Sequence, residues 1–186
     1  KADVIIDKSY PENAHIDNYR DFALYFQDED NILGTSFMPY LQNVAGLTGV
    51  NYRLEPWSYR EDEGCELGNM FTACVVADSD PATPTIKAHA GDNVMINVFG
   101  AHNEQNQMFN VDGHQWRRHL NQEGSDMIDV EEFGGGEYIQ AFFNAGGTYK
   151  NPGTYLWLDA RTPYQQAGQW GYMKVLPSGD RSILPL

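Results

Sequence analysis

The stretch Gly153–Val175, GTYLWLDARTPYQQAGQWGYMKV, decides the fold. It reads as two strands, Tyr155–Leu158 and Tyr172–Leu176, on either side of a loop. The run just before and into it, Asn151-Pro152-Gly153-Thr154-Tyr155, resembles a tyrosine corner, in which a Tyr hydroxyl bonds back to nearby backbone at a Greek-key crossover. The stretch therefore predicts the closing strands of a two-sheet β-sandwich.

Alternation of apolar and other residues predicts further strands upstream. A strand at Thr85–Ala90, a turn at 91–93 and a strand at Val94–Val98 together read as a hairpin-like unit. The other segments with a period of two are Phe22–Phe26, Phe109–Val111 and Ile139–Phe143. These segments predict an all-β fold.

The rest of the chain is rich in loops. Residues 31–64 contain too many Gly and Pro residues for a long helix, and the aromatic residues Tyr52, Trp57 and Tyr59 indicate a packed connection. Residues 1–18 read as an extended arm followed by a turn, which pairs either with this domain or with another one. The content of 13% aromatic residues favours a folded β domain over a disordered chain.

Length and charge limit the classes of function. A chain of 186 residues fits one domain with a well-formed core. The formal net charge of −14 repels polyanions, which argues against a nucleic-acid partner. No membrane-spanning run or signal peptide is visible, and the chain begins at Lys1 rather than Met, so we expect a mature or excised product.

Cys65 and Cys74 are the only cysteines, and a short acidic loop separates them. A disulfide between them is the natural pairing, and two free thiols are the alternative. Such a bridge predicts an oxidising, extracytoplasmic compartment, namely the periplasm, the cell surface or the secreted medium.

Four segments together resemble a known family. They are YRDFALYFQ at Tyr19–Gln27, GVNYRLEPW at Gly49–Trp57, the run from Gly91 through Trp116, and the final stretch Gly153–Val175. They resemble a cupredoxin-like domain of the large multidomain multicopper oxidases, of the bacterial manganese-oxidase and ceruloplasmin-like type. The resemblance implies a Greek-key cupredoxin-like β-sandwich over residues 19–177, with residues 1–18 as an arm or linker and 178–186 as a tail or linker.

The final stretch lacks the copper ligands that the family carries there. In the oxidases this loop supplies His-Cys-His, then His, then an axial Met to copper. Laid on that pattern, the corresponding residues are Leu158, Asp159, Ala160, Tyr164 and Gln169. Type 1 copper needs a short thiolate bond and two imidazoles, which a carboxylate, a phenol and aliphatic chains do not replace.

The upstream half of the pattern is degenerate as well. The oxidases place a His-x-x-His-x-His-Gly run on an earlier strand, and the matching run here extends from Gln107 to His114. Aligned on Gly113, the ligand positions become Gln107, Asn110 and Asp112. The resemblance therefore implies that ligands of the trinuclear copper centre, which lies between two domains in these oxidases, are missing too.

Other candidate sites are weaker. His102, His114 and His119 are the candidates for an intrinsic metal site, but their spacing is not that of a ligand set. His114 could also face a neighbouring domain. Two acidic clusters could hold Ca²⁺, although neither has the spacing of a calcium loop; they are Glu61, Asp62, Glu63 and Glu66, and Asp126, Asp129, Glu131 and Glu132. No hydrolase or nucleotide motif is present, so the isolated chain shows no catalytic centre.

The leading hypothesis is a copper-free, structural or interface domain or subunit of a multicopper oxidase assembly. Copper would lie in partner cupredoxin domains, which would carry the one-electron oxidation of substrate coupled to O₂ reduction. The alternative is a secreted structural or adhesive β-sandwich that self-associates in an extracellular layer through its extended arm and Pro-containing tail.

Overall fold

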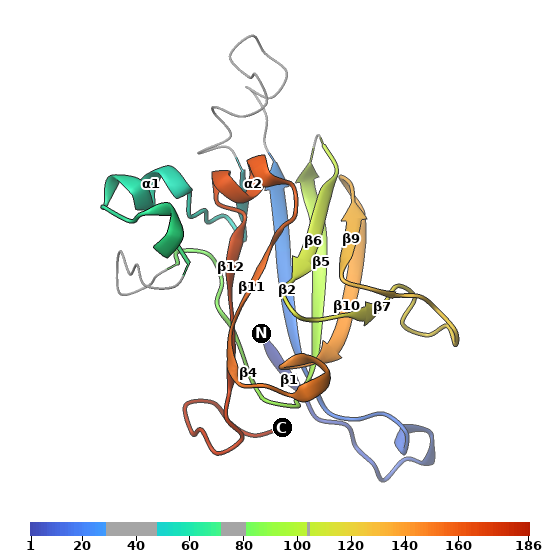
Figure 1. The fold of residues 1–186 in the computed structure, drawn as a ribbon. Helices are drawn as coiled ribbons and strands as arrows, with labels where there is room; N and C mark the ends of the chain where they lie inside the picture. Colours follow the sequence, from blue (N-terminus) through green and yellow to red (C-terminus); the bar gives the residue numbers. More distant parts are fainter. Residues whose placement is uncertain (29–47, 72–80, 104) are drawn as a thin grey trace.

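A computed structural model describes residues 1–28, 48–71, 81–103 and 105–186. Two main sheets face each other, and a small pair of strands flanks them (Figure 1). The first sheet holds β1 (Ala2–Val4), β2 (Tyr19–Asp28), β3 (Thr48–Val50), β5 (Asn93–Asn103) and β10 (Tyr138–Asn144). The second holds β4 (Ile86–His89), β12 (Trp170–Leu176), β11 (Gly153–Asp159), β6 (Gln107–Val111) and β9 (Val130–Phe133).

Short elements complete the described part of the chain. β7 (Trp116–Arg117) pairs with β8 (Met127–Ile128), and α2 (Thr162–Ala167) joins β11 to β12 at one end of the sandwich. The others are α1 (Trp57–Asp62) and the 3₁₀ turns η1 (Pro11–Asn13), η2 (Leu67–Asn69) and η3 (Gly147–Tyr149). Within the described residues, no helix is long and apolar enough to cross a membrane.

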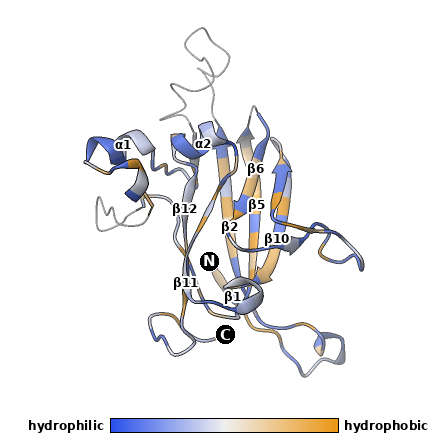
Figure 2. Cartoon of the chain, in the orientation of Figure 1, coloured by the Kyte–Doolittle hydropathy of each residue, from blue (hydrophilic) through white to orange (hydrophobic). Residues whose placement is uncertain are grey.

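The core lies between the two sheets, where strand alternation puts apolar side chains (Figure 2). Phe22, Leu24 and Phe26 on β2 are all buried, as the period of two predicts. Phe26 is central, because it makes edge-to-face contacts with Phe109, Phe133 and Trp157. The predicted all-β Greek-key cupredoxin-like sandwich is confirmed.

Two details of the closing strands were also predicted. β11 and β12 pair antiparallel, from Gly153 opposite Val175 to Leu158 opposite Trp170. The Tyr155 hydroxyl donates to the Asn151 carbonyl at 2.9 Å, which confirms the tyrosine corner.

The predicted hairpin at residues 85–98 is wrong. β4 pairs parallel with β12 in the second sheet, whereas β5 pairs with β2 and β10 in the first. The turn at Gly91, where φ is +88°, therefore carries the chain from one sheet to the other. Local sequence shows where a strand turns, but the partner strand lies far along the chain.

The packed connection is built differently from the prediction. Tyr52 and Tyr59 are exposed, Tyr52 by 89%, and Trp57 packs edge-to-face on Phe71. The anchor is Arg60, which is fully buried. Its guanidinium donates to Glu55 and to the Met70 carbonyl, both at 3.1 Å, and lies 5.1 Å from the Trp170 ring centroid. Cys65 is buried nearby, but Cys74 lies outside the described residues, so the disulfide stays a prediction.

A second buried arginine ties both chain ends to the sandwich. Arg20 on β2 donates to Asp92 Oδ2 at 2.6 Å and to Asp3 Oδ1 at 2.9 Å. It also donates to the Leu184 carbonyl at 2.7 Å and lies 3.2 Å from His89 Nδ1. Residues 2–4 pair antiparallel with β2, so the N-terminal arm belongs to the first sheet of this same domain.

We predict that Arg20→Met strongly destabilises the domain. The substitution leaves the carboxylates of Asp3 and Asp92 without their shared cation, and breaking a buried ion pair costs about 3–5 kcal/mol. Arg181→Met, on an exposed arginine, is the matched control and should change stability by no more than about 0.5 kcal/mol. Urea unfolding measures both, and equal losses in the two variants would contradict the prediction.

Candidate functional site

The loop that would supply copper ligands folds as the short helix α2. Pro163 lies in its first turn, and Gly168 ends it with a φ of +115°. Gly168 is required there because a Cβ atom would stand 2.4 Å from the backbone nitrogen of Glu55. The close approach of Gly168 to Glu55 fixes α2 over the end of the sandwich. Tyr164, which belongs to α2, is buried there.

The period of two along β11 and β6 sorts by face five of the eight degenerate positions, which lie on or next to these strands. On β11, Tyr155 and Trp157 face the core, so Asp159 faces inward, and Leu158 faces outward. On β6, Phe109 and Val111 face the core, so Gln107 faces inward, while Asn110 and the following Asp112 face outward. Gln107 is therefore separated from Asn110 and Asp112, with which the sequence pattern grouped it.

The inward positions form one buried polar layer at the α2 end of the sandwich. We define this layer as Asp28, Thr48, Gln107, Asp159 and Gln169, all of which are buried. Four of these residues lie two positions from a core residue on the same strand. Asp28 and Asp159 follow Phe26 and Trp157, whereas Thr48 and Gln107 precede Val50 and Phe109. Asp28 and Thr48 are direct partners across β2 and β3. Sequence reasoning missed both of them.

Hydrogen bonds connect the layer across the two sheets. The Tyr164 hydroxyl donates to Asp28 Oδ2 at 3.0 Å, and Gln169 Nε2 donates to the Gln27 carbonyl at 2.9 Å. The Asp159 backbone N–H donates to the Gln169 carbonyl at 2.9 Å. The layer is thus held from β2, α2, β11 and the start of β12.

Several polar atoms of the layer have no hydrogen-bond partner among the described residues. They are both amide atoms of Gln107, Oδ2 of Asp159, Oε1 of Gln169 and Oγ1 of Thr48. Buried polar atoms are nearly always satisfied in native proteins, and each unsatisfied one costs about 1–3 kcal/mol. This concentration of unsatisfied oxygens sets the layer apart from the rest of the core.

Asp159 is the most perturbed group of the layer. Burial raises its pKa to about 7, against the lowering effect of N–H donation from Arg161 at 2.7 Å and from Met108 at 3.4 Å. The nearby Arg161 charge lowers the pKa as well, and the nearby Asp28 charge raises it. Near neutral pH the carboxyl is therefore divided between its neutral and charged forms.

The layer does not fit type 1 copper. Its side chains offer carboxylate, amide and hydroxyl groups, whereas blue copper requires a thiolate and imidazoles. Asp159 holds the position that the resemblance assigns to the copper-binding Cys. Among the described residues, no group of three or more His, Cys, Asp or Glu side chains could hold a metal ion.

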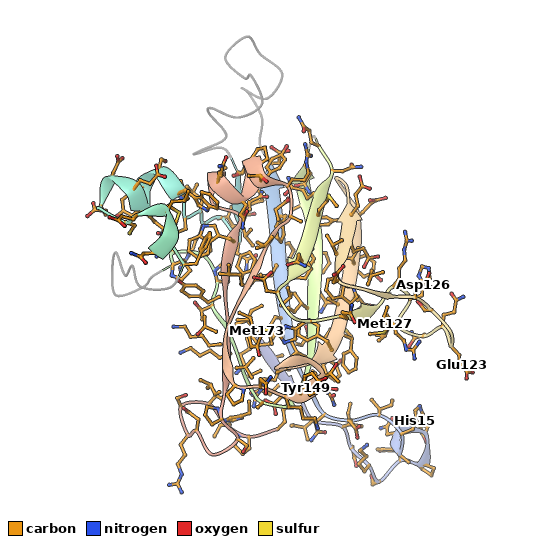
Figure 3. All side chains as sticks on the ribbon, in the orientation of Figure 1. His15, Glu123, Asp126, Met127, Tyr149 and Met173 are labelled. Atoms are coloured by element: carbon orange, nitrogen blue, oxygen red, sulfur yellow. The ribbon has the colours of Figure 1, made fainter. Side chains whose placement is uncertain are left out.

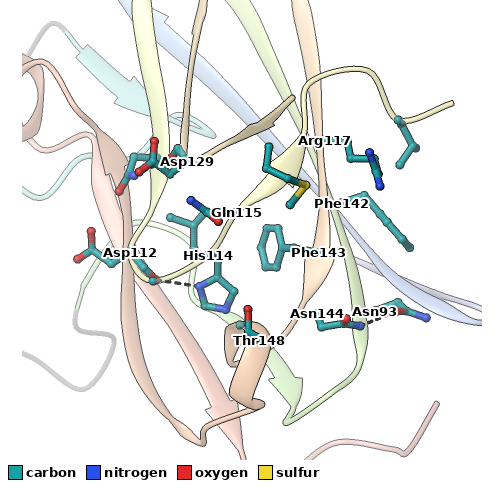
Figure 4. Close-up of a pocket in the computed structure, with 16 residues that line it drawn as sticks. Asn93, Asp112, His114, Gln115, Arg117, Asp129, Phe142, Phe143, Asn144 and Thr148 are labelled. Carbon is teal, nitrogen blue, oxygen red and sulfur yellow. Dashed lines mark hydrogen bonds between the residues drawn. The ribbon is translucent and has the colours of Figure 1, made fainter. Parts of the chain in front are cut away.

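The outward positions lie on a separate surface. Asn110 is the direct partner of Leu158, and the Ala160 N–H donates to the Met108 carbonyl at 2.7 Å. Asn110 and Asp112 line an open pocket of about 880 Å³, whose wall also includes Arg117 and Asp129 (Figure 4). The Asn110 amide donates to the Asp129 carbonyl at 2.7 Å, which holds it against β9.

His114 is structural rather than a free ligand. The ring is 1% exposed, so it does not face a neighbouring domain as the sequence suggested. Nδ1 donates to the Asp112 carbonyl at 2.8 Å and Nε2 accepts from the Gly146 N–H at 3.0 Å. Burial lowers the pKa of His114, which fits this neutral tautomer. His119 is exposed on a loop, and the side chain of His102 lies outside what the structure describes.

The two acidic clusters do not assemble into calcium sites in the described residues. Glu131 accepts from the Trp116 indole at 3.2 Å, and Glu132 accepts from Asn106 at 2.7 Å. Figure 3 shows Asp126 and Glu123 on a loop that projects from the sandwich. Glu131 and Glu132 are thus each bonded to a different side chain and do not share a common centre.

We predict that Asp159 makes stability fall as pH rises. Its folded pKa of about 7 lies above the value near 3.9 of an unfolded Asp, so the folded state binds the proton more tightly. Its contribution is complete below about pH 4 and is lost as pH rises through about 7. In metal-free buffer, urea unfolding from pH 5 to pH 8, about the window concerned, should show a steeper loss for the parent than for Asp159→Asn. Parallel profiles would contradict the prediction.

The comparisons with known proteins agree with this fold. A family model described as multicopper oxidase matches residues 63–180, more than half of the 186 residues. No curated protein matches the chain.

Several solved structures share the fold. A multi-copper oxidase from Pediococcus acidilactici aligns over 90% of this chain and 29% of its own, with 7% identity and a TM-score of 0.55. A multicopper oxidase from Campylobacter jejuni, described as a metallo-oxidase, aligns over 85% and 30%, with 13% identity and a TM-score of 0.54. A multicopper oxidase named mgLAC aligns over 88% and 45%, with 18% identity and a TM-score of 0.51.

This chain spans less than half the length of each of these proteins. Identities this low establish the fold alone, and the family match supplies the rest. The sandwich and the match over residues 63–180 together show that the chain belongs to the multicopper oxidase family.

Proposed function

We propose that this chain is a cupredoxin-like domain without copper of its own, which serves a structural and interface role in a multicopper oxidase assembly. Copper would lie in partner domains, where one-electron substrate oxidation would be coupled to O₂ reduction. The observation that carries the proposal is Asp159, which stands where the resemblance places the copper-binding Cys, inside a closed layer of oxygen and amide groups.

The chemistry of the ligands supports this role. Copper sites of the blue type are built from soft thiolate and imidazole donors, and the inward layer offers neither. The outward positions Asn110, Asp112, Leu158 and Ala160 likewise carry no imidazole. Electron transfer through a copper at either position is therefore not part of the proposed role.

The surface over the outward positions is the proposed contact for a partner domain. Asn110 and Asp112 lie in the open pocket, close to Met127, a largely exposed side chain on β8 (Figure 3). Polar groups around scattered apolar ones are typical of non-obligate interfaces. We propose another cupredoxin domain of the same assembly as the occupant, in an extracytoplasmic compartment.

The self-associating alternative loses the feature that motivated it. β1 pairs with β2 of the same chain, and the carbonyl of Leu184 is bonded to Arg20. Residues 2–4 and the Leu184 carbonyl are thus both engaged within the chain. The interface role therefore remains the better supported of the two.

Copper reconstitution tests the proposal directly. After incubation with Cu²⁺ and removal of excess metal, we expect the chain to retain no stoichiometric copper by elemental analysis, because no soft ligand stands at the inward positions. We also expect no thiolate-to-copper absorption band. Asp159→Cys provides a spectroscopic control for the position. One tightly bound copper per chain in the parent would overturn the proposed function.

The interface can be tested by charge reversal. Asp112→Lys places a cation in the pocket without removing a core side chain, because Asp112 is exposed. We expect it to weaken association with the copper-carrying polypeptide by at least about tenfold, through loss of electrostatic complementarity. Glu61→Lys, on the exposed face of α1, makes the same charge change away from the pocket. Equal retention of both variants in a pull-down would argue against this surface.

A further inference from the structure

The buried polar layer concentrates oxygen atoms where a folded core normally has none. Four of these oxygens have no hydrogen-bond partner in the described residues: Thr48 Oγ1, Gln107 Oε1, Asp159 Oδ2 and Gln169 Oε1. Each belongs to a side chain that is at most 3% exposed. Gln107 Nε2 is the one amide donor of the layer without a partner in the described residues, and it can serve at most two of these oxygens. The remaining oxygens require a positive partner or another donor.

The layer is contiguous. Asp159 lies opposite Gln169 across β11 and β12, and Gln107 is its diagonal neighbour across β6, since Asp159 is the direct partner of Phe109. Directly paired side chains in a sheet stand about 4.5–5.5 Å apart at Cβ, and diagonal ones about 7–8 Å. These three oxygen-bearing side chains of the second sheet are therefore within reach of one another.

The first sheet contributes from the opposite side. Asp28 and Thr48 are direct partners on β2 and β3, and both face inward. The charge of Asp28 acts on Asp159, and Gln169 donates to the carbonyl of Gln27, the residue before Asp28. The oxygen-bearing side chains of the two sheets therefore face the same buried region at the α2 end of the sandwich.

We propose that the buried polar layer binds one Ca²⁺ ion, coordinated by the side-chain oxygens of Asp28, Thr48, Gln107, Asp159 and Gln169. Two carboxylates match the charge of a divalent cation, and the amide and hydroxyl oxygens add neutral donors of the kind that calcium accepts. The position lies within the sandwich at the place where the family carries a copper held by soft ligands.

The side-chain oxygens of the buried polar layer favour Ca²⁺ over other metal ions. Oxygen ligands favour hard cations over copper or zinc. Mg²⁺ prefers to keep several of its waters in an octahedral shell, whereas Ca²⁺ accepts six to eight protein oxygens in a flexible geometry. The side chains of the layer are all buried, which disfavours an ion that arrives with a shell of water.

The guanidinium of Arg161 does not take the place of the proposed Ca²⁺ ion. Arg161 donates from Nη2 to Gln105 Oε1 at 2.9 Å and from Nη1 to the Asn106 carbonyl, so these bonds hold the guanidinium on the segment before β6. Only its backbone N–H donates to Asp159, and that bond goes to Oδ1. Oδ2 of Asp159 remains available to the ion.

Calorimetric titration of the chelator-treated chain with CaCl₂ tests the proposal. We expect one Ca²⁺ per chain, with a dissociation constant between about 10⁻⁶ and 10⁻³ M, and a rise in melting temperature that Mg²⁺ does not reproduce. Asp159→Asn should weaken binding by at least about tenfold. The double variant Glu61→Gln and Glu63→Gln removes exposed acidic charge of the same kind and should bind as the parent does.

A second variant separates a binding site from a polar core that is merely structural. Gln107→Glu adds a third carboxylate, so it should tighten Ca²⁺ binding by about tenfold while lowering the melting temperature in the absence of Ca²⁺. No stoichiometric binding, or binding lost in the Glu61 and Glu63 variant but retained in Asp159→Asn, would overturn the proposal and leave the proposed function intact. Copper that competes with Ca²⁺ for the same site would overturn both.

Discussion

The core-facing side of β2 fixes the sandwich at both ends. Its inward residues run from Arg20 through Phe22, Leu24 and Phe26 to Asp28, so an apolar run lies between a buried cation and a buried anion. At one end Arg20 joins the two chain ends and the β4–β5 turn, and at the other end Asp28 accepts from Tyr164 of α2. Because a slip of one residue would turn all five of these side chains outward, β2 strongly constrains the register of its neighbours.

The same period of two determines what the candidate site can be. A polar residue on β6 or β11 is either inside the sandwich or on its surface, and sequence neighbours go to opposite sides. On β11, for example, Asp159 faces the core, whereas Leu158 is on the opposite face of the sheet beside Asn110 and is largely covered there. The family's ligand pattern therefore maps onto two separate places: a buried layer rich in oxygen, and an outward face that lines an open pocket and that we propose contacts a neighbouring domain.

Much of the fold could be predicted from sequence because it rests on local alternation. Phe22–Phe26, Val94–Val98 and the tyrosine corner at Tyr155 were all predicted, since each pattern is complete within a few residues. The partner of β4 could not be predicted, because it is β12, which lies more than eighty residues later in the chain. The helix α2 was hidden because the family resemblance gave that segment the role of a ligand loop.

The candidate site, like the fold, could be predicted from the sequence only in part. Asp159, Gln107 and Gln169 were found as degenerate ligand positions, but their convergence with Asp28 and Thr48 joins distant parts of the sequence. The inward position of Asp28 could have been predicted from the sequence, because Asp28 lies two residues after Phe26 and so continues the alternation along β2. The position of Thr48 could not have been predicted in this way. The motif grouped Gln107 with Asn110 and Asp112 by spacing, and spacing does not specify on which face of the sheet each side chain lies.

The place of β12 in the second sheet has a consequence for how this domain is made. β12 lies between β4 and β11, so the last strand in the order of the described residues is an interior strand and not an edge. Until residues 170–176 emerge, the two halves of that sheet have no hydrogen-bonded connection, and the edges of β4 and β11 stay open to other chains. The second sheet of this domain can therefore form completely only after residues 170–176 have been synthesised.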